Sequence, residues 1–179
     1  MKKTPRQYAE SGIYHIYVRG NNKEYIFKTK EEKETYLKII TEAREKYKFK
    51  ILAYAIMDNH AHILLKIENE KLSKAMQNIQ QKYTYYYNKK YKRTGRVFQG
   101  RYNSKACGED EYLLEVIKYI HQNPEKAGLD QKFTFEFTSH KNYITDEKGI
   151  VDADYVLGIL NPDFKKAREI YLDYLKREE

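Results

Sequence analysis

Apolar residues recur along the chain at two spacings, and each spacing predicts a type of element. Alternate apolar residues in 13–19 predict a half-buried strand. Apolar residues three and four positions apart predict amphipathic helices over 31–47 and 71–91. Two short apolar runs between those helices, 50–57 and 61–67, predict strands that are joined by a tight turn.

The second half of the chain continues the same order. Residues 98–107 are expected to be extended, and 109–122 to form a third helix that stops at Asn123-Pro124. The pattern then weakens until a last amphipathic helix over 162–177. Strand, helix, strand, strand, helix, strand is the order of the ferredoxin-like split βαβ unit. We therefore expect an α+β fold, an antiparallel sheet with helices packed on it.

Composition narrows the class of partner. The 179 residues suit one domain, and a net charge of +8 favours a polyanion as partner, with nucleic acid first and an anionic membrane surface second.

The single cysteine excludes a disulfide framework and a cysteine-based zinc cluster. No stretch approaches the ~18 apolar residues of a membrane span, and the first residues hold no apolar signal segment. We expect a cytoplasmic protein.

Two histidines, His60 and His62, flank one alanine at the start of the second short apolar run. Residues two apart on a strand point to the same face, so their imidazoles converge. Neutral imidazole binds metals, and two of them leave positions open for substrate. The alternative is a pair of ordinary hydrogen-bonded strand histidines. A histidine-triad hydrolase would need a third alternating histidine, where the chain has Leu64.

The third predicted helix places Tyr119 and Asn123 one turn apart, beside its apolar stripe. A tyrosine hydroxyl is a weak nucleophile until its anion is stabilised or its proton is removed. A metal on a phosphate would neutralise charge and orient the bond for attack. The amide oxygen of Asn123 could complete such a metal site. The alternative is a core tyrosine and an asparagine that only ends the helix.

Residues 82–102 combine seven Lys or Arg with six tyrosines and no acidic residue. Basic groups bind phosphates, and aromatic rings stack unpaired bases for ~1–3 kcal/mol each. This mixture suits single-stranded or hairpin DNA, although a solvated helix end with core tyrosines has the same composition. His15 is expected to be structural. The candidate DNA contacts are Arg19, Asn21, Asn22, Arg93, Arg96, Arg101, Tyr102 and Lys105.

Four segments in one order resemble a known family. They are YHIYVRGNNKEYIF, AYAIMDNHAHILL, TGRVFQGRYNSKA and EYLLEVIKYIHQNPEKAGL. Together they make the chain, from about residue 8 to about 145, similar to the REP-associated tyrosine transposases. These are a branch of the insertion-sequence-type HUH single-strand transposases, named for histidine, hydrophobic residue, histidine.

The resemblance implies a ferredoxin-like HUH catalytic domain over 1–145 and a C-terminal helical extension over 146–179. It implies that His60 and His62 bind Mg²⁺ or Mn²⁺, with Asn123 as a third, polar ligand. Tyr119 would attack a phosphate of single-stranded or hairpin DNA and form a 5′-phosphotyrosine link, leaving a free 3′-hydroxyl. Relatives occur as homodimers and as single-chain forms, so both states are open.

Two departures from the family pattern accompany this resemblance. The family often has Met-Pro-Asn before the first histidine, whereas this chain has Asp58 in the middle position, as a loop residue or a partner of the metal site. The family's Trp-Ser-Ser-Tyr segment is Phe-Thr-Ser-His over 137–140, so no role is transferred to it. The rival interpretations are a non-catalytic protein that recognises hairpin repeats and an RNA-binding ferredoxin-like module.

Overall fold

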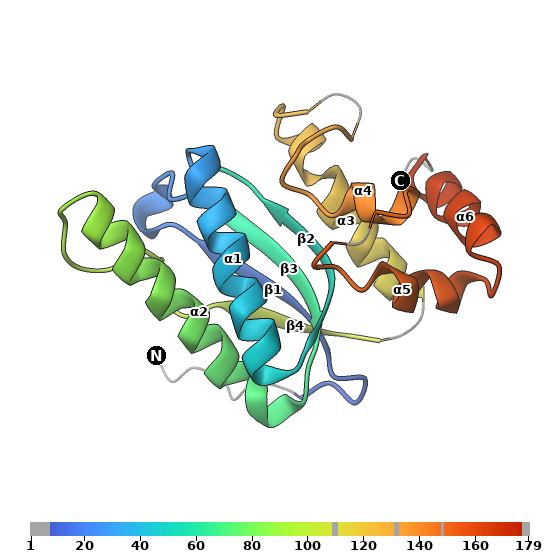
Figure 1. Ribbon diagram of the computed structural model, residues 1–179, viewed down its shortest axis with the longest axis horizontal. Helices are drawn as coiled ribbons and strands as arrows, with labels where there is room; N and C mark the ends of the chain where they lie inside the picture. Colours follow the sequence, from blue (N-terminus) through green and yellow to red (C-terminus); the bar gives the residue numbers. More distant parts are fainter. Residues whose placement is uncertain (1–7, 109–110, 131–132, 148, 177–179) are drawn as a thin grey trace.

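Four strands form one antiparallel sheet in the order β2-β3-β1-β4. The computed structural model describes residues 8–108, 111–130, 133–147 and 149–176 (Figure 1). The strands are β1 (Ile13–Arg19), β2 (Lys50–Ile56), β3 (His60–Lys66) and β4 (Asn103–Cys107). This order and the helices packed on the sheet confirm the expected α+β, ferredoxin-like class.

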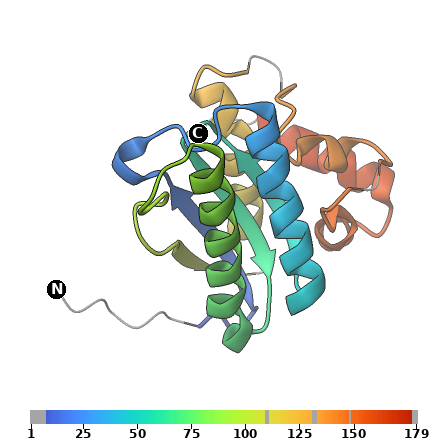
Figure 2. The same ribbon diagram turned by 60° about the vertical axis from the view of Figure 1, so that its left-hand side comes forward.

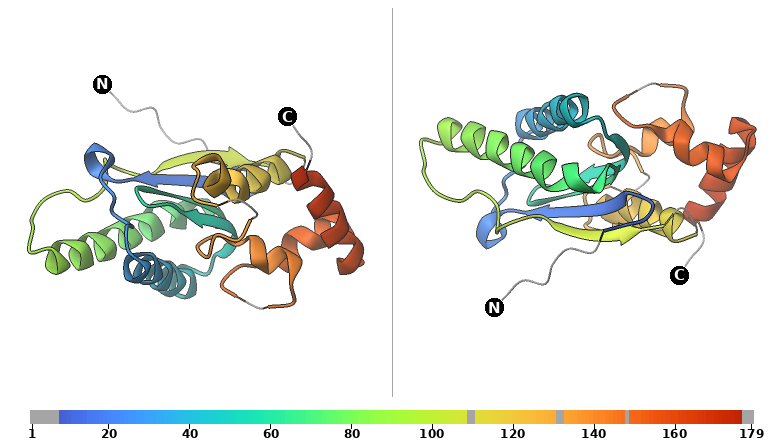
Figure 3. Two further views of the ribbon diagram at one scale, coloured as in Figure 1. Left: turned by 90° about the horizontal axis from the view of Figure 1, so that it is seen from above. Right: turned by 90° about the horizontal axis from the view of Figure 1, so that it is seen from below.

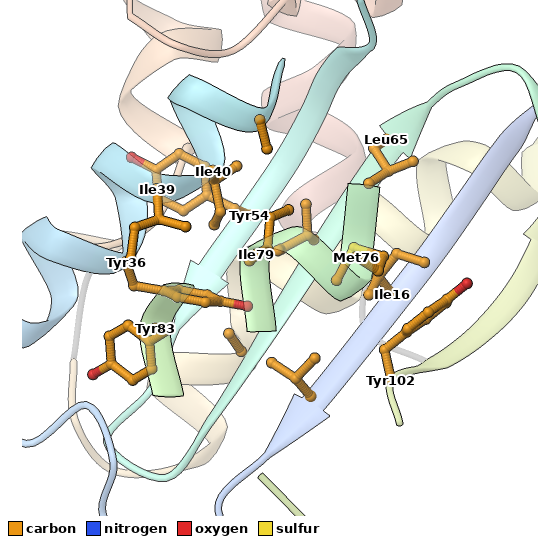
Figure 4. Packing of buried hydrophobic residues seen from close by; sticks show 14 of the residues in the cluster. Ile16, Tyr36, Ile39, Ile40, Tyr54, Leu65, Met76, Ile79, Tyr83 and Tyr102 are labelled. Atoms are coloured by element: carbon orange, nitrogen blue, oxygen red, sulfur yellow. The ribbon is translucent and has the colours of Figure 1, made fainter. Parts of the chain in front are cut away.

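One face of the sheet is covered by α1 (Lys30–Tyr47) and α2 (Asn69–Lys90), which lie side by side (Figure 2). A capping box at Thr29 and Glu32 begins α1. Aromatic side chains fill the space between these helices and the strands, and the rings of Tyr36 and Tyr83 meet edge to face (Figure 4). The periodicity that predicted both helices therefore corresponds to this core.

The other face of the sheet carries α3 (Glu111–Lys126), whose apolar stripe packs into a second core cluster. That cluster is completed by α4 (His140–Ile144), α5 (Ala153–Leu160) and α6 (Phe164–Lys176). Figure 3 shows these C-terminal helices at the end of the molecule away from the loop that follows α2. Within the described part of the chain, no helix is long and apolar enough to cross a membrane.

The predicted stop of the third helix at Asn123-Pro124 is wrong, because α3 continues through Pro124 to Lys126. The helix ends instead at a Schellman motif, in which Gly128 has a φ of +72°. The backbone N–H of Gly128 donates to the carbonyl of Glu125, and that of Leu129 donates to the carbonyl of Pro124. Proline removed one donor without ending the helix, and the glycine ended it.

The C-terminal region is more helical than its pattern indicated. The last helix begins at Phe164, where the side chain of Asp163 accepts hydrogen bonds from the N–H groups of Lys165 and Lys166. Residue 177, the predicted end, lies outside the described residues. The short helices α4 and α5 were not predicted. The extended segment predicted over 98–107 forms a strand only over its last five residues.

The turn that leads into β3 is held by hydrogen bonds from the segment between β1 and α1 and from α1 itself. The backbone N–H of Gly20 donates to the carbonyl of Asn59, and that of Phe27 donates to the carbonyl of Asp58. The Asp58 side chain accepts a hydrogen bond of 2.7 Å from Nζ of Lys33, which comes from α1 and is buried. Asp58 therefore fixes the turn toward the face of the sheet that α1 and α2 cover.

We expect the Asp58→Ala variant to lose about 2 kcal/mol of unfolding free energy, because it leaves the buried Lys33 ammonium without its carboxylate. Glu136→Ala is the matched control, since Glu136 pairs with Lys30 at an exposed site and such pairs contribute at most about 0.5 kcal/mol. Urea denaturation measures both. Equal losses in the two variants would show that the turn does not depend on this ion pair.

Candidate active site

The candidate site forms where β1 and β3 lie side by side. In their antiparallel register, Tyr17 lies opposite His62 and Arg19 lies opposite His60. Directly opposite residues share a face of the sheet. Ala61 and Ile63 point into the core beneath α1 and α2, so His60 and His62 point to the face that carries α3. The convergence predicted from their spacing is present, with ring centroids 5.2 Å apart.

Both histidines are oriented by hydrogen bonds. Nδ1–H of His60 donates to the side-chain oxygen of Asn59 over 2.6 Å, which leaves a lone pair on the other ring nitrogen. The side chain of Asn123 lies beside the same ring. Nδ1 of His62 shares a hydrogen bond of 2.9 Å with Nε2 of His15. His15, expected to be structural, therefore acts within the site as the partner of His62.

Burial keeps these imidazoles neutral. Desolvation, helped by the neighbouring His15 and His60, lowers the pKa of His62 to about 2. Desolvation, helped by Lys105, lowers the pKa of His15 to about 4. Desolvation also lowers the pKa of His60, and the hydrogen bond with Asn123 opposes this shift. At neutral pH the site therefore offers uncharged nitrogen donors.

Tyr119 reaches this site from α3 of the same chain. Its ring meets that of His62 edge to face with centroids 5.3 Å apart, and it lies 6.0 Å from His15. The side chain is 43% exposed, so a ligand can approach it. Tyr17, from β1, is a second tyrosine beside both HUH histidines, 5.0 Å from His62 and 5.5 Å from His60, and burial raises its pKa.

The donor set fits a divalent cation. Two imidazoles that bind one cation at about 2.1 Å place their ring centroids roughly 5 Å apart, as observed for His60 and His62. The side chain of Asn123 lies beside the His60 ring, so its amide is near the same place. Among the described residues, no group of three His, Cys, Asp or Glu able to hold a metal occurs.

Comparison with known proteins identifies the family. The model of the family described as "Transposase IS200 like" matches residues 8–123, which is more than half of the chain. The chain belongs to this IS200-like transposase family. Transposases cleave DNA and transfer its strands, so the protein is a DNA-processing enzyme by family. No functionally curated protein matches the sequence significantly.

Solved structures agree with this family at the level of the fold. A REP-associated tyrosine transposase, solved bound to a REP hairpin, superposes with a TM-score of 0.70 at 17% identity. The match covers 84% of this chain and 90% of that one, and it confirms the expected resemblance in fold. A Deinococcus radiodurans R1 protein assigned as a transposase matches with a TM-score of 0.46 at 15% identity. That match covers 66% of this chain and 95% of the other.

The transposase carries a cleft of about 1240 Å³ between α2 and the basic loop over 93–102. A smaller groove of about 250 Å³ is lined by Tyr17, Arg19 and Asn103. Gln80, Gly100 and Arg101 line both spaces. A polar path therefore leads from the basic loop to the strand that carries Tyr17, beside the histidines.

The predicted DNA contacts differ in how they are placed. Arg96 and Arg101 are exposed in the large cleft. Arg93 also lines it, but its guanidinium donates to Glu24 over 2.8 Å. The ring of Tyr102 is buried in the core, with its hydroxyl 3.3 Å from that of Ser73, so it does not offer a face for stacking. Figure 4 shows it among the packed side chains.

The second predicted cluster lies nearer the histidines. Arg19 is half-buried on the site face of β1 and lines the small groove. Asn21 and Asn22 begin a short 3-10 helix, and the N–H of Asn21 donates to the carbonyl of Val97 in the basic loop. Lys105 lies opposite His15 on β4, with its ammonium 4.6 Å from the ring of Tyr112.

Sequence reasoning missed three residues at these surfaces. His15 and Tyr17 share a strand face with Arg19 by the same two-residue spacing that paired the HUH histidines, so this signal was present in IYHIYVR. Tyr85 lines the large cleft and is 72% exposed. Among the tyrosines of 82–102, pattern alone did not separate this exposed ring from the buried ones.

We expect the unfolding free energy to fall as the pH drops from about 6.5 to 5. Burial lowers the pKa of every histidine below its unfolded value of 6.5, so in this range the unfolded chain binds protons that the native chain does not. The limit is about 1.4 kcal/mol per pH unit for each histidine. Carboxylates with lowered pKa, such as Glu42, act only below about 4.5. Urea titrations in chelator at several pH values measure the slope, and constant stability between pH 7 and 5 would contradict it.

Proposed function

We propose that this transposase is a metal-dependent nuclease and strand transferase that acts on single-stranded DNA near a hairpin, with Tyr119 as its nucleophile. The observation that carries the proposal is the edge-to-face contact of Tyr119 with His62 within one chain. It places an accessible phenol beside the neutral imidazole of His62, whose ring lies 5.2 Å from that of His60, and all three side chains belong to one chain.

We assign His60, His62 and Asn123 as the residues that would hold Mg²⁺ or Mn²⁺. When bound, the cation supplies charge neutralisation on the scissile phosphate and aligns it for displacement. His60 keeps its ring orientation through Asn59, and His62 through His15. Such partners of metal ligands fix the tautomer that presents the lone pair to the metal.

The proposed chemistry is two displacements at phosphorus. The Tyr119 oxygen forms a bond to the phosphorus and loses its proton to solvent, the bond from phosphorus to the 3′-oxygen breaks, and that oxygen takes up a proton. The products are a 5′-phosphotyrosine link and a free 3′-hydroxyl. In strand transfer, a DNA 3′-oxygen forms a bond to the same phosphorus and loses its proton to solvent, the bond from phosphorus to the tyrosine oxygen breaks, and that oxygen takes up a proton.

Hairpin DNA is the proposed partner on two grounds. The solved REP-associated transposase holds a REP hairpin, and its fold matches this chain. In this chain the large cleft presents Arg96, Arg101 and the exposed ring of Tyr85, which are groups that bind phosphates and stack on unpaired bases. The small groove at Arg19 adjoins the cleft and is lined by Tyr17, whose ring lies beside both histidines.

We expect wild-type protein to form a covalent adduct with labelled, hairpin-bearing single-stranded DNA in Mn²⁺, seen as a shifted band on a denaturing gel. Tyr119→Phe removes the attacking oxygen and should abolish the adduct. Tyr112→Phe, two turns earlier on the same helix, is the matched control and should retain it. The His62→Ala variant should reduce adduct formation by at least about 100-fold while it retains hairpin binding.

Other outcomes separate the alternatives. Hairpin binding without any adduct, across several repeat-like DNAs, would support the non-catalytic binding protein. Adduct formation by Tyr119→Phe would show that another residue, with Tyr17 the nearest candidate, is the nucleophile. Mixing Tyr119→Phe with His62→Ala should restore nothing if both residues act in one chain, and restored adduct would place them in different chains of a homodimer.

Arg101→Gln should weaken hairpin binding at physiological salt and lower the slope of log K against log salt by about 1, because one phosphate contact is lost. Arg93→Gln is the comparison, since the Arg93 guanidinium already pairs with Glu24 and should contribute less to DNA binding. Fluorescence anisotropy over a series of salt concentrations measures both slopes. An unchanged slope for Arg101→Gln would remove this arginine from the interface.

A further inference from the structure

The helix that carries Tyr119 is anchored from its opposite side by a buried histidine. His121 follows two residues later, about 200° around the helix, and is 1% exposed. Its two ring nitrogens each meet a hydroxyl at 2.7 Å, Nδ1 that of Tyr171 and Nε2 that of Ser139. The same residue thus connects α3 to α6 and to the segment before α4.

The hydrogen bonds continue beyond His121 at both ends. The Tyr171 hydroxyl also lies 2.7 Å from Nδ1 of His140, and Oγ of Ser139 accepts a hydrogen bond of 2.9 Å from the backbone N–H of Tyr54 in β2. All four side chains are buried. One network therefore joins β2, α3, the start of α4 and α6.

The Tyr171 hydroxyl is the group that links the two buried imidazoles of His121 and His140. It has one proton and lies between two imidazole nitrogens, so it donates to one and accepts from the other. Desolvation lowers the pKa of both histidines, so the network is complete without a charge. Loss of this hydroxyl would leave two buried imidazole nitrogens without their partner.

A serine hydrogen bonded to a histidine resembles a nucleophile and its base, but burial argues against chemistry here. Ser139 has no exposed surface, and neither it nor His121 lines the large cleft or the small groove beside Tyr17. No substrate atom could reach the hydroxyl. The network can act only through the elements that it joins.

We propose that His121 and Tyr171 are positioning residues that set the rotation of α3, so that Tyr119 faces His62. This inference rests on the proposed role of Tyr119. A tyrosine hydroxyl lies roughly 8 Å from its helix axis, so a rotation of about 10° moves it by about 1.4 Å. Misplacement by about 1 Å can cost 100-fold in rate. The C-terminal helix α6 thereby braces the active site without entering it.

The test is Tyr171→Phe in the full chain, which removes the hydroxyl and keeps the ring. We expect the single-turnover rate of adduct formation in saturating Mn²⁺ to fall by about tenfold or more, with hairpin affinity within about twofold of wild type. Tyr143→Phe is the matched control. The Tyr143 hydroxyl is equally buried, but it donates to the carbonyl of Leu52 in β2 over 2.7 Å and not to His121. Tyr143→Phe should therefore lower Tm by a similar amount and leave the rate of adduct formation unchanged.

A second variant and a readout independent of activity complete the test. Ser139→Ala removes the partner on the other side of His121 and should lower the rate in the same way. Fluorotyrosine placed at position 119 should change its ¹⁹F shift in Tyr171→Phe and not in Tyr143→Phe. Equal rates for Tyr171→Phe and wild type, or equal losses in both tyrosine variants, would overturn the positioning role. Absence of adduct from wild type would instead overturn the proposed function, while the ¹⁹F shift would still test the positioning role.

Discussion

The antiparallel register of β1 against β3 is the constraint on which the site depends. It places Tyr17 opposite His62 and Arg19 opposite His60, and the same pairing puts His15 within hydrogen-bond distance of His62. A slip of one residue would turn both HUH histidines into the core beneath α1 and α2. The register is held by the apolar residues of the opposite face, such as Ile16 and Ile63, which have no alternative place.

The two faces of this sheet therefore differ in function, because the same strands present an apolar core on one face and the histidines on the other. Beneath α1 and α2 the packing is apolar and aromatic, which makes the strands rigid. On the other face, the rows that point toward α3 begin with apolar residues such as Leu64 and end with His60 and Arg19. Burial beside the second core keeps the imidazoles neutral, while the cations of the basic loop stay at the rim. Neutral imidazoles therefore lie inside this face, and positive charge lies at its rim.

Periodicity predicted most of the fold because most elements have one buried face. It failed where a local rule competed with packing. Pro124 suggested a helix end, but the stripe that includes Ile120 is buried and α3 continues past it to the glycine motif. The short helix α5 has apolar residues nearly throughout, VLGIL among them, so it showed no period. These are limits of patterns that consider one element at a time.

The convergence of the two histidines was predictable because it needs only strand geometry. The approach of Tyr119 was not predictable from spacing, since it depends on how α3 crosses the sheet, and the resemblance supplied that expectation. Exposure was also hidden, because Tyr85 and Tyr102 belong to one basic, tyrosine-rich stretch and only packing separates the exposed ring from the buried one. The role of Asp58 was open, and its hydrogen bond to Lys33 directs it toward α1.

The family match ends at residue 123, yet residues beyond it are hydrogen bonded to the helix that carries Tyr119. The segment over 137–140 lacks the family's tryptophan, but its serine and histidine hold the inner side of α3 through His121 and Tyr171. The apolar contacts between α3 and the sheet are not directional. Hydrogen bonds to both nitrogens of one buried imidazole are directional, and they restrict the rotation of α3. The C-terminal helices therefore form one packed unit with the helix that carries Tyr119.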